Sequence, residues 1–286
     1  MSKYTPFNNP KNIKIENNSI DFSTTNIMGI LNITNDSFYD GGRYLTEEKI
    51  IQQCGKMLKA GAKIIDLGAC SSRPGSIPIS AEEEIEKLLP IISKIKKEYP
   101  KIIISIDTFR SIVAEKCILQ GADIINDIYS GQFDNKMFDV IAKYNIPYII
   151  MHMQGKPENM QSNPKYNNVT KEVFMFFKEK IELLKNKGIH NIIIDPGFGF
   201  GKTIRHNYEL LNNLHVFNKL KKPILVGVSR KSMIYNILNS NAKNALNGTS
   251  VIHTLALLKK INILRVHDVK EAMECIKIIK FAESIK

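Results

Sequence analysis

Eight short apolar runs recur along the chain, and they constrain its fold more than any other feature. Each is rich in isoleucine or valine, ends in polar residues or glycine, and is followed by helical spacing of apolar residues. In order they read NIMGILN, KIIDLG, KIIISID, ADIINDI, PYIIMHM, NIIIDPG, PILVGVS and ILRVHD. Near-continuous apolar runs of this length are typical of parallel strands buried on both faces. Eight of them alternating with helices predict an α/β fold, a single (β/α)8 TIM barrel.

Local signals refine this prediction. Thr46 and Ser80, each followed by glutamates, indicate helix starts, and Gly61 and Gly188 indicate helix ends. Before the first run, NIKIENNSIDFS alternates apolar and polar residues around Asn17 and Asn18. This predicts a short β-hairpin that caps the barrel floor. Because no linker-like tract divides the chain, we expect an N-terminal arm and hairpin over residues 1–26 and one barrel domain over 27–286.

Composition sets the broad class. The 286 residues suit a barrel of this type, and 43% hydrophobic with 24% charged residues is typical of a globular protein. No run of eighteen apolar residues occurs, and the N-terminal MSKYTPFNNPKN has no apolar signal segment. We therefore expect a cytoplasmic protein with no membrane partner. The cysteines, Cys54, Cys70, Cys117 and Cys275, lie far apart and predict reduced thiols.

The net charge of +12 raises the question of nucleic acid. The lysines are scattered through helical segments such as SKIKKEYPK, where a solvated helix face is the usual explanation. We expect no nucleic-acid partner, and anionic small substrates remain compatible with the charge.

Candidate functional residues follow the apolar runs, because a barrel of this type carries its chemistry at the C-terminal ends of the strands. The candidates are Asn32, Ser72, Arg73, Asp107, Asn126, His152, Asp195, Ser229, Arg230, Lys231, Arg265 and His267. Ser229 alone is better explained as a helix cap. Asp107, Asn126 and Asp195, however, end three almost wholly apolar runs, and converging buried polar groups need a polar ligand. A flat heterocycle with several N–H groups would suit them.

Cations gather at the last two strands. Arg230, Lys231, Arg265 and His267 follow runs seven and eight, where barrels of this type often bind phosphate. The neighbouring Asn32 offers a hard oxygen for one Mg2+ position, which substrate phosphate and water would complete. Together the tips predict a pocket for a heterocycle that carries a phosphate group.

Three loops complete the mouth. NDSFYDGGRY and CSSRPGSIP are long and polar, as expected of mobile lids or of exposed turns. DPGFGFGKT resembles a phosphate-binding loop, but only three residues separate Gly197 from Gly201, so the Walker spacing fails. We interpret Asp195 as the important residue of this loop and Lys202 as a surface lysine.

Eight motifs match one family in the correct order. They are MGILNITNDSFYDGG, DLGACSSRPGS, SIDTFR, GADIINDI, MHMQGKPENMQ, DPGFGFGKT, GVSRKS and LRVHDVKE. On these motifs the chain, from about Ile27 to about Lys280, resembles the dihydropteroate synthases, which are pterin-binding enzymes of folate biosynthesis.

The resemblance implies roles for individual residues. It implies that Asp107, Asn126, Asp195 and Lys231 hold the pterin ring, with Arg265 stacked on it. Asn32, Ser72, Arg265 and His267 would meet the diphosphate, Asn32 through Mg2+. The 4-aminobenzoate subsite would consist of Phe38, Ser72, Pro74, Phe200, Lys231 and Ser232. The catalytic set would be Lys231, Asp107, Asp195, Arg265 and His267, and Arg73 joins the substrate-binding residues.

The implied reaction is a transfer. It condenses (7,8-dihydropterin-6-yl)methyl diphosphate with 4-aminobenzoate to 7,8-dihydropteroate and diphosphate, by Mg2+-assisted dissociative displacement. The resemblance also suggests a homodimer through the later helices and a sulfonamide target. Two alternatives stay open: a pterin-binding methyltransferase barrel, which would not need the SRKS and RVHD cations, and a barrel that binds pterin without catalysis.

The chain departs from the family pattern at four places. Asn35 replaces a proline, Ser72 a threonine, Ala69 and Cys70 a Gly-Glu pair, and KKIN precedes the last run where Gly-Ala is common. Serine keeps the hydroxyl group of threonine. Asparagine in place of proline loosens a loop. We therefore expect the Asn35 substitution to alter 4-aminobenzoate affinity and not the reaction type.

Overall fold

Eight parallel strands form the centre of the molecule. The computed structural model describes residues 12–15, 18–33, 47–70, 79–155 and 160–285. The strands are β3 (Asn26–Asn32), β4 (Ile64–Gly68), β5 (Ile103–Asp107), β6 (Ile124–Asp127), β7 (Tyr148–Met151), β8 (Ile192–Asp195), β9 (Leu225–Val226) and β10 (Ile263–Val266). Their spatial order is β8, β7, β6, β5, β4, β3, β10, β9, and a parallel bridge between Ile194 and Ile224 joins the two edges. The sheet therefore closes into the predicted barrel.

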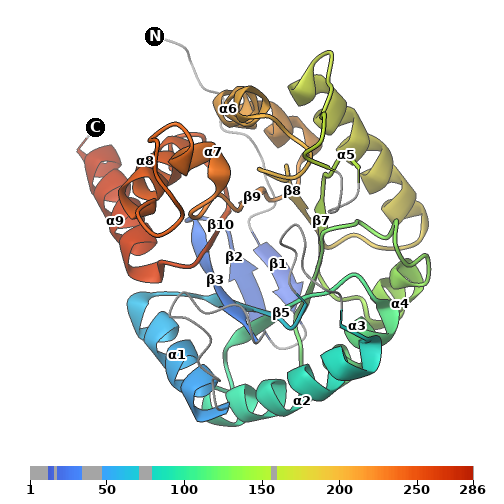
Figure 1. Ribbon diagram of the computed structural model, residues 1–286. Helices are drawn as coiled ribbons and strands as arrows, with labels where there is room; N and C mark the ends of the chain where they lie inside the picture. The colour runs from blue at the N-terminus through green and yellow to red at the C-terminus, as the bar shows by residue number, and fades with distance from the viewer. Residues whose placement is uncertain (1–11, 16–17, 34–46, 71–78, 156–159, 286) are drawn as a thin grey trace.

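Helices surround the strands (Figure 1). They are α1 (Glu47–Ala60), α2 (Ala81–Glu98), α3 (Ser111–Leu119), α4 (Met137–Tyr144), α5 (Val169–Asn186), α6 (Ile204–Asn212), the 3-10 helix η1 (Leu214–Leu220), α7 (Ser232–Tyr235), α8 (Leu246–Leu257) and α9 (Val269–Ser284). The helices pack their apolar stripes against the outside of the barrel, because an apolar helix face must be buried against another element. Within the described ranges, no helix combines the length and apolarity that a bilayer crossing requires.

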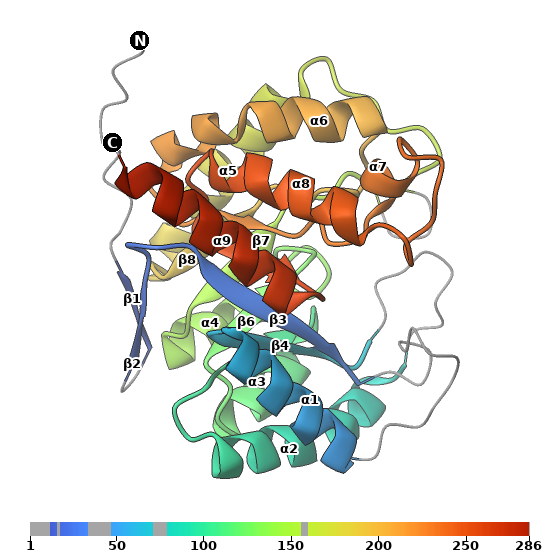
Figure 2. The same ribbon diagram turned by 90° about the vertical axis from the view of Figure 1, so that its left-hand side faces the viewer.

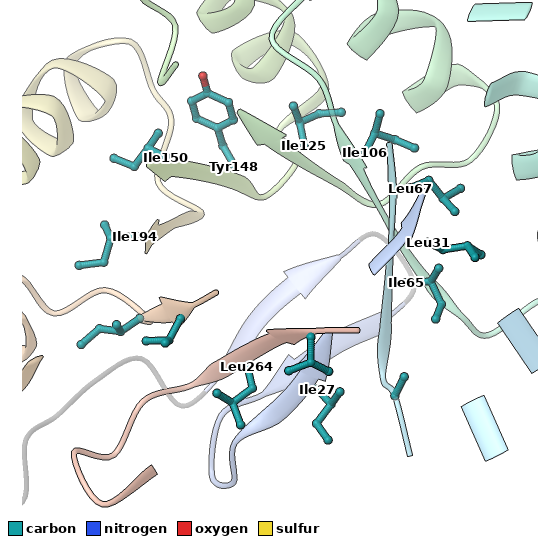
Figure 3. Close-up of a cluster of buried hydrophobic side chains, with 14 of the residues drawn as sticks. Ile27, Leu31, Ile65, Leu67, Ile106, Ile125, Tyr148, Ile150, Ile194 and Leu264 are labelled. Atoms are coloured by element: carbon teal, nitrogen blue, oxygen red, sulfur yellow. The ribbon is translucent and has the colours of Figure 1, made fainter. Parts of the chain in front are cut away.

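The outward side chains of the strands make the larger of two cores. Ile65, Leu67, Ile106 and Ile150 are members of it, together with apolar residues of the helices. Figure 3 shows these side chains arranged around the strands and directed away from the barrel interior. Because both faces of each strand are buried, the strands appear in the sequence as continuous apolar runs.

A second, smaller core lies inside the barrel. Each strand contributes one residue to it: Met28, Ile64, Ile103, Ile124, Ile149, Ile193, Leu225 and Ile263. The other members, Ile13, Ile15, Ile20 and Phe22, come from the segment before β3. That segment forms the antiparallel hairpin β1 (Asn12–Ile15) and β2 (Asn18–Asp21), which lies at the end of the barrel where β3 begins (Figure 2). The hairpin thus closes the barrel floor, as predicted.

Local details confirm most of the expected boundaries. The Ser80 hydroxyl accepts a hydrogen bond from the Glu83 amide at the start of α2 (3.1 Å), and Gly61 and Gly188 take φ values of +110° and +80° after α1 and α5. Thr46 lies outside the described residues.

Two boundaries differ from the prediction. Asn18, around which the hairpin was expected to turn, pairs with Ile15 and is the first residue of β2. The run PILVGVS contains only a two-residue strand, because the chain turns after it: the Lys231 amide donates to the Val228 carbonyl. The division into an arm of residues 1–26 and one domain of residues 27–286 stays a prediction.

Removing apolar volume from the hairpin should destabilise the barrel. Ile20 is 2% exposed in the floor core, so Ile20→Ala should lower the free energy of unfolding by about 2 to 5 kcal/mol. Lys14 of the same hairpin points to solvent, and Lys14→Ala should stay within about 0.5 kcal/mol of the unsubstituted protein. Urea denaturation followed by circular dichroism measures both. Equal effects of the two substitutions would contradict the packing of the hairpin on the floor.

Candidate active site at the barrel mouth

A layer of polar side chains lies directly above the apolar floor. Side chains alternate between the two faces of a strand, so the residue two positions after each floor residue also faces the interior. At this level five strands contribute polar residues: Asp66, Ser105, Asn126, Asp195 and Arg265. Two residues further along, Asn32, Gly68, Asp107 and His267 reach the mouth. The barrel therefore brings the predicted Asp107, Asn126 and Asp195 to one interior surface.

Arg265 is the centre of this layer. Its Nε donates to Asp66 Oδ2 at 2.7 Å, and its Nη2 donates to Asp107 Oδ2 at 2.8 Å. Burial alone would lower the pKa of Arg265, but the two carboxylates outweigh burial and raise it above its usual value. The guanidinium is thus a permanent charge held along two of its edges, and its plane has a defined orientation.

The carboxyl group of Asp107 has a strongly raised pKa. Burial raises its pKa to about 7; Arg265 opposes this shift, while the carboxylates of Asp66, Glu84 and Asp127 add to it. The group therefore changes charge near neutral pH and can act either as an acceptor or as a donor.

Asp66 was not predicted from the sequence. The search covered the residues after each apolar run, whereas Asp66 lies inside the run KIIDLG. It is fully buried, and its Oδ2 also accepts a hydrogen bond from Asn126 Nδ2 at 3.1 Å. A carboxylate can only accept, so the amide nitrogen of Asn126 must face Asp66 and its Oδ1 remains for another partner. A lone acid within an apolar run is the signal that would have identified it.

Further polar capacity remains in this layer. Asp66 Oδ1 and Ser105 Oγ are buried and have no hydrogen-bond partner among the described residues. Buried polar atoms of proteins are nearly always paired, so this part of the barrel suits a polar ligand.

Asp195 and Lys231 form the opposite side of the site. Asp195 Oδ1 accepts from the Gly197 amide at 2.8 Å; burial raises the pKa of its carboxyl, and the Lys231 ammonium opposes that shift. Lys231 Nζ donates to the Phe198 carbonyl at 2.6 Å and lies 4.7 Å from the centre of the Phe200 ring. Burial lowers the pKa of Lys231 to about 8, although Asp195 acts in the other direction. The residue therefore holds a labile positive charge beside an aromatic face.

The predicted cation cluster is smaller than expected. Arg230 is engaged in a two-pronged ion pair with Asp268 (2.8 and 3.0 Å) and donates to the Ala242 and Lys243 carbonyls. Its role is therefore to fasten the loop after β9 to the start of α9. His267 and Ser232 are exposed at the mouth, while Phe200 and Asn32 are half-buried.

The interpretation of Lys202 as a surface lysine was wrong. Its side chain is only 3% exposed, and its ammonium contacts His152 Nδ1 (3.0 Å) and the carbonyls of His152 (3.2 Å), Gly197 (2.9 Å) and Phe200 (2.9 Å). Burial lowers the pKa of Lys202 to about 7, and Asp195 opposes that shift. Burial and the nearby Lys202 charge lower the pKa of His152 to about 3. His152, a strand-end candidate, is therefore a neutral acceptor for Lys202.

Other candidates fall on residues whose structure is not described here: Phe38, Ser72, Arg73 and Pro74, as well as the substituted Asn35. Cys70 is half-buried, and burial raises the pKa of its thiol. This disfavours the thiolate form of Cys70.

Known proteins match both the sequence and this architecture. A family model described as pterin binding enzyme matches residues 28–267. The dihydropteroate synthase of Escherichia coli (strain K12) is 40% identical over 270 residues, which is 94% of this chain and 95% of that protein.

Solved structures agree with the sequence match. The Yersinia pestis dihydropteroate synthase in complex with a sulfonamide drug matches with a TM-score of 0.91 and 37% identity over 96% of this chain and 99% of its own. The Xanthomonas albilineans dihydropteroate synthase with 4-aminobenzoic acid matches with a TM-score of 0.89 and 30% identity, over 96% of this chain and 99% of its own.

The chain belongs to the family of pterin binding enzymes. Within that family it has the function of a dihydropteroate synthase, a transferase of folate biosynthesis. This confirms the resemblance seen in the sequence.

Asp66 should control the protonation of Asp107. Because the Asp66 carboxylate raises the pKa of Asp107, Asp66→Asn should move that pKa below about 7. Carbon-13 NMR of labelled aspartate carboxyl groups measures the titration, with Asp107→Asn to assign the signal. The control Ser105→Ala removes a polar atom of the same layer without removing charge, and it should leave the titration in place. An unchanged Asp107 pKa in Asp66→Asn would contradict the coupling.

Proposed function

We propose that the polar layer binds the pterin ring of (7,8-dihydropterin-6-yl)methyl diphosphate. The observation that carries this proposal is the convergence of Asp107, Asn126 and Asp195 on one buried surface, together with Arg265 and Lys231. Asn126 Oδ1 and the carboxylates would accept hydrogen bonds from the ring N–H groups. The guanidinium of Arg265, fixed by Asp66 and Asp107, offers a planar surface on which the ring can stack.

The diphosphate would lie on the cationic side of the mouth. Arg265 is a permanent cation there, and His267 is exposed four residues after the floor residue Ile263. Asn32 ends β3, which is hydrogen-bonded to β10 and therefore borders the same side. Ser72 would add a hydroxyl donor, as the family resemblance implies.

The residues present fit Mg2+ as a metal shared with the substrate. No group of three His, Cys, Asp or Glu side chains suited to a metal occurs among the described residues. Asn32 supplies a half-buried amide oxygen near Asp107: a methyl group added to Gly68 would lie 3.6 Å from Asn32 Oδ1 and 3.4 Å from Asp107 Cβ. Mg2+ commonly takes one or two protein oxygens and completes its shell with substrate phosphate and water. When bound, it would neutralise charge that develops on the departing diphosphate.

The 4-aminobenzoate subsite would lie between Lys231 and the two long loops. Phe200 and Lys231 are adjacent, and Ser232 opens α7 beside them. Phe38, Ser72, Arg73 and Pro74 would complete the substrate contacts. The complex of the Xanthomonas albilineans relative with 4-aminobenzoic acid supports a site for this molecule in the fold.

The proposed reaction is a dissociative displacement. The bond between the methyl carbon and oxygen breaks, and its electron pair leaves with the diphosphate, so positive charge develops on the dihydropterin. Asp107 and Asp195 stabilise the cation, and Arg265, His267 and Lys231 stabilise the leaving group. The amine nitrogen of 4-aminobenzoate then forms the C–N bond and loses a proton to solvent. No side-chain nucleophile is needed, and the site contributes orientation and fixed charge.

Assembly and location follow the family resemblance. Val251 and Leu255 of α8 and Leu258, the residue that follows it, are exposed, and so are Ile278 and Phe281 of α9. Figure 2 shows α8 and α9 side by side. This surface supports the proposal of a homodimer through the later helices. The relatives described above are synthases, which favours this function over a methyltransferase or a silent pterin binder. Sulfonamide sensitivity and the cytoplasmic location stay predictions.

Asn32→Ala should separate metal use from pterin binding. The unsubstituted protein should release diphosphate and dihydropteroate in equal amounts from both substrates with Mg2+. Asn32→Ala should raise the Mg2+ concentration for half-maximal rate about tenfold or more, since about 1.4 kcal/mol corresponds to a tenfold change. Affinity for the dihydropterin diphosphate without Mg2+ should stay within about twofold, measured by calorimetry. An unchanged Mg2+ requirement would remove Asn32 from the metal site, and no product at all from the unsubstituted protein would contradict the reaction.

Lys231 should make substrate binding sensitive to alkaline pH. Its pKa of about 8 in the free protein means that the ammonium is present below pH 8 and is lost above it. Affinity for the dihydropterin diphosphate should therefore fall about tenfold between pH 7 and pH 9. Lys231→Met should bind the dihydropterin diphosphate more weakly at pH 7, and its affinity should change much less between pH 7 and pH 9. Asp107 and Lys202 titrate in both proteins, so the comparison isolates the contribution of Lys231. Parallel pH profiles of the two proteins, from calorimetry, would show that Lys231 does not carry the charge.

A further inference from the structure

The loop after β8 is held by a buried cation. Lys202 places its ammonium among the Gly197, Phe200 and His152 carbonyls and His152 Nδ1, at 2.9 to 3.2 Å. Its three N–H donors are thereby fully used, and no room remains for a phosphate ligand. Three carbonyl oxygens directed at one point repel one another and would lose their shared hydrogen-bond donor without the Lys202 amine, so this backbone shape depends on Lys202.

The loop is also pressed against the segment that follows β7. A methyl group at Gly197 would lie 1.9 Å from the His152 carbonyl oxygen, and one at Gly201 would lie 2.3 Å from that of Gln154. Both glycines have positive φ values, +71° and +59°. Because His152 supplies two of the four Lys202 contacts, Lys202 fastens the β8 loop to the β7 segment.

The contacts of this loop with the described site residues come from residues 197–200, whose first and last carbonyls are the ones that Lys202 holds. The Gly197 amide donates to Asp195 Oδ1, the Phe198 carbonyl accepts from Lys231 Nζ, and the Phe200 ring lies under the same ammonium. Gly199 packs on the stem of Lys231, since a methyl group there would be 3.3 Å from Lys231 Cδ. The shape of residues 197–200 therefore sets the position of Lys231.

We propose that Lys202 is a positioning residue for the transfer reaction: by holding residues 197–200, it places Lys231 and Phe200 for 4-aminobenzoate. The proposal rests on the proposed function, which assigns those two residues to the 4-aminobenzoate subsite. Asp107 and Asn126 stand on β5 and β6 and do not depend on this loop. Loss of Lys202 should accordingly weaken 4-aminobenzoate binding through both Lys231 and Phe200, and should weaken binding of the pterin substrate only through Lys231 and Asp195.

The test compares Lys202→Met with Lys222→Met in the full-length protein. Lys222 also donates to a backbone carbonyl, that of His190 at 2.7 Å, but both residues precede strands and lie at the floor end of the barrel. Lys202→Met should raise the KM for 4-aminobenzoate about tenfold or more, and it should raise the Kd for the dihydropterin diphosphate no more than Lys231→Met does. Lys222→Met should leave both constants unchanged. An unchanged KM for 4-aminobenzoate in Lys202→Met, or a larger loss of dihydropterin diphosphate affinity than in Lys231→Met, would overturn the proposal.

A double substitution tests whether Lys202 acts through Lys231. Lys231→Met alone should raise the KM for 4-aminobenzoate, and adding Lys202→Met should then raise it by a smaller factor than Lys202→Met does alone, because one of the two positioned groups is already gone. Fully multiplicative effects would show that Lys202 acts independently and would overturn the proposal. If Lys231→Met alone has no effect, the assigned subsite is wrong, which is a separate result. Should Lys202→Met fail to fold, Lys202→Gln keeps two donors and should show the same selective change with smaller size.

Discussion

Every second side chain of a barrel strand must point into the barrel. The rest of the structure depends on which side chains fill that interior. At the floor, one apolar residue from each strand meets the hairpin β1–β2. Two residues further along, the same strands carry Asp66, Asn126, Asp195 and Arg265. The apolar floor excludes water from below, so the charged groups above it interact in a poorly screened environment. A strongly polar site is thus built on a dry support.

Within that site, charge balance determines orientation. Three carboxylates, those of Asp66, Asp107 and Asp195, face two cations, Arg265 and Lys231. Asp66 and Asp195 are buried and the other three ions are half-buried, so the partners offset part of the desolvation that burial imposes. The excess of acceptors over donors suits a heterocycle with N–H groups that develops positive charge, while Arg265 and His267 are left on the side of the anionic leaving group. In the proposed reaction, the arrangement of the strands would therefore separate the positive charge on the dihydropterin from the negative charge on the diphosphate.

The β8 loop shows how the same residue types can serve different purposes. Glycines followed by lysine resemble a phosphate-binding loop, but here the lysine turns inward and the carbonyls, not the amides, converge on it. The amide of Gly197 is used by Asp195, and the carbonyl of Phe198 by Lys231. The loop is thus built around the buried Lys202 side chain and supplies a hydrogen-bond partner to both Asp195 and Lys231.

Much of the fold and part of the site were readable from the chain. Strands buried on both faces leave continuous apolar runs, so the barrel, its floor hairpin and the strand-end residues Asp107, Asn126 and Asp195 follow from local pattern. The family motifs added the reaction, because all eight match the family in the correct order between about Ile27 and about Lys280.

Tertiary structure alone decided which side chains hold the others in place. Asp66 and Arg265 are 199 residues apart, and Lys202 and His152 are 50 apart, so no local pattern records either pair. The sequence determined the strands and the polar residues at their ends, through the two-residue alternation of a strand. Whether a lysine faces solvent or fills its hydrogen bonds inside the protein depends on acceptors that only the closed barrel brings together.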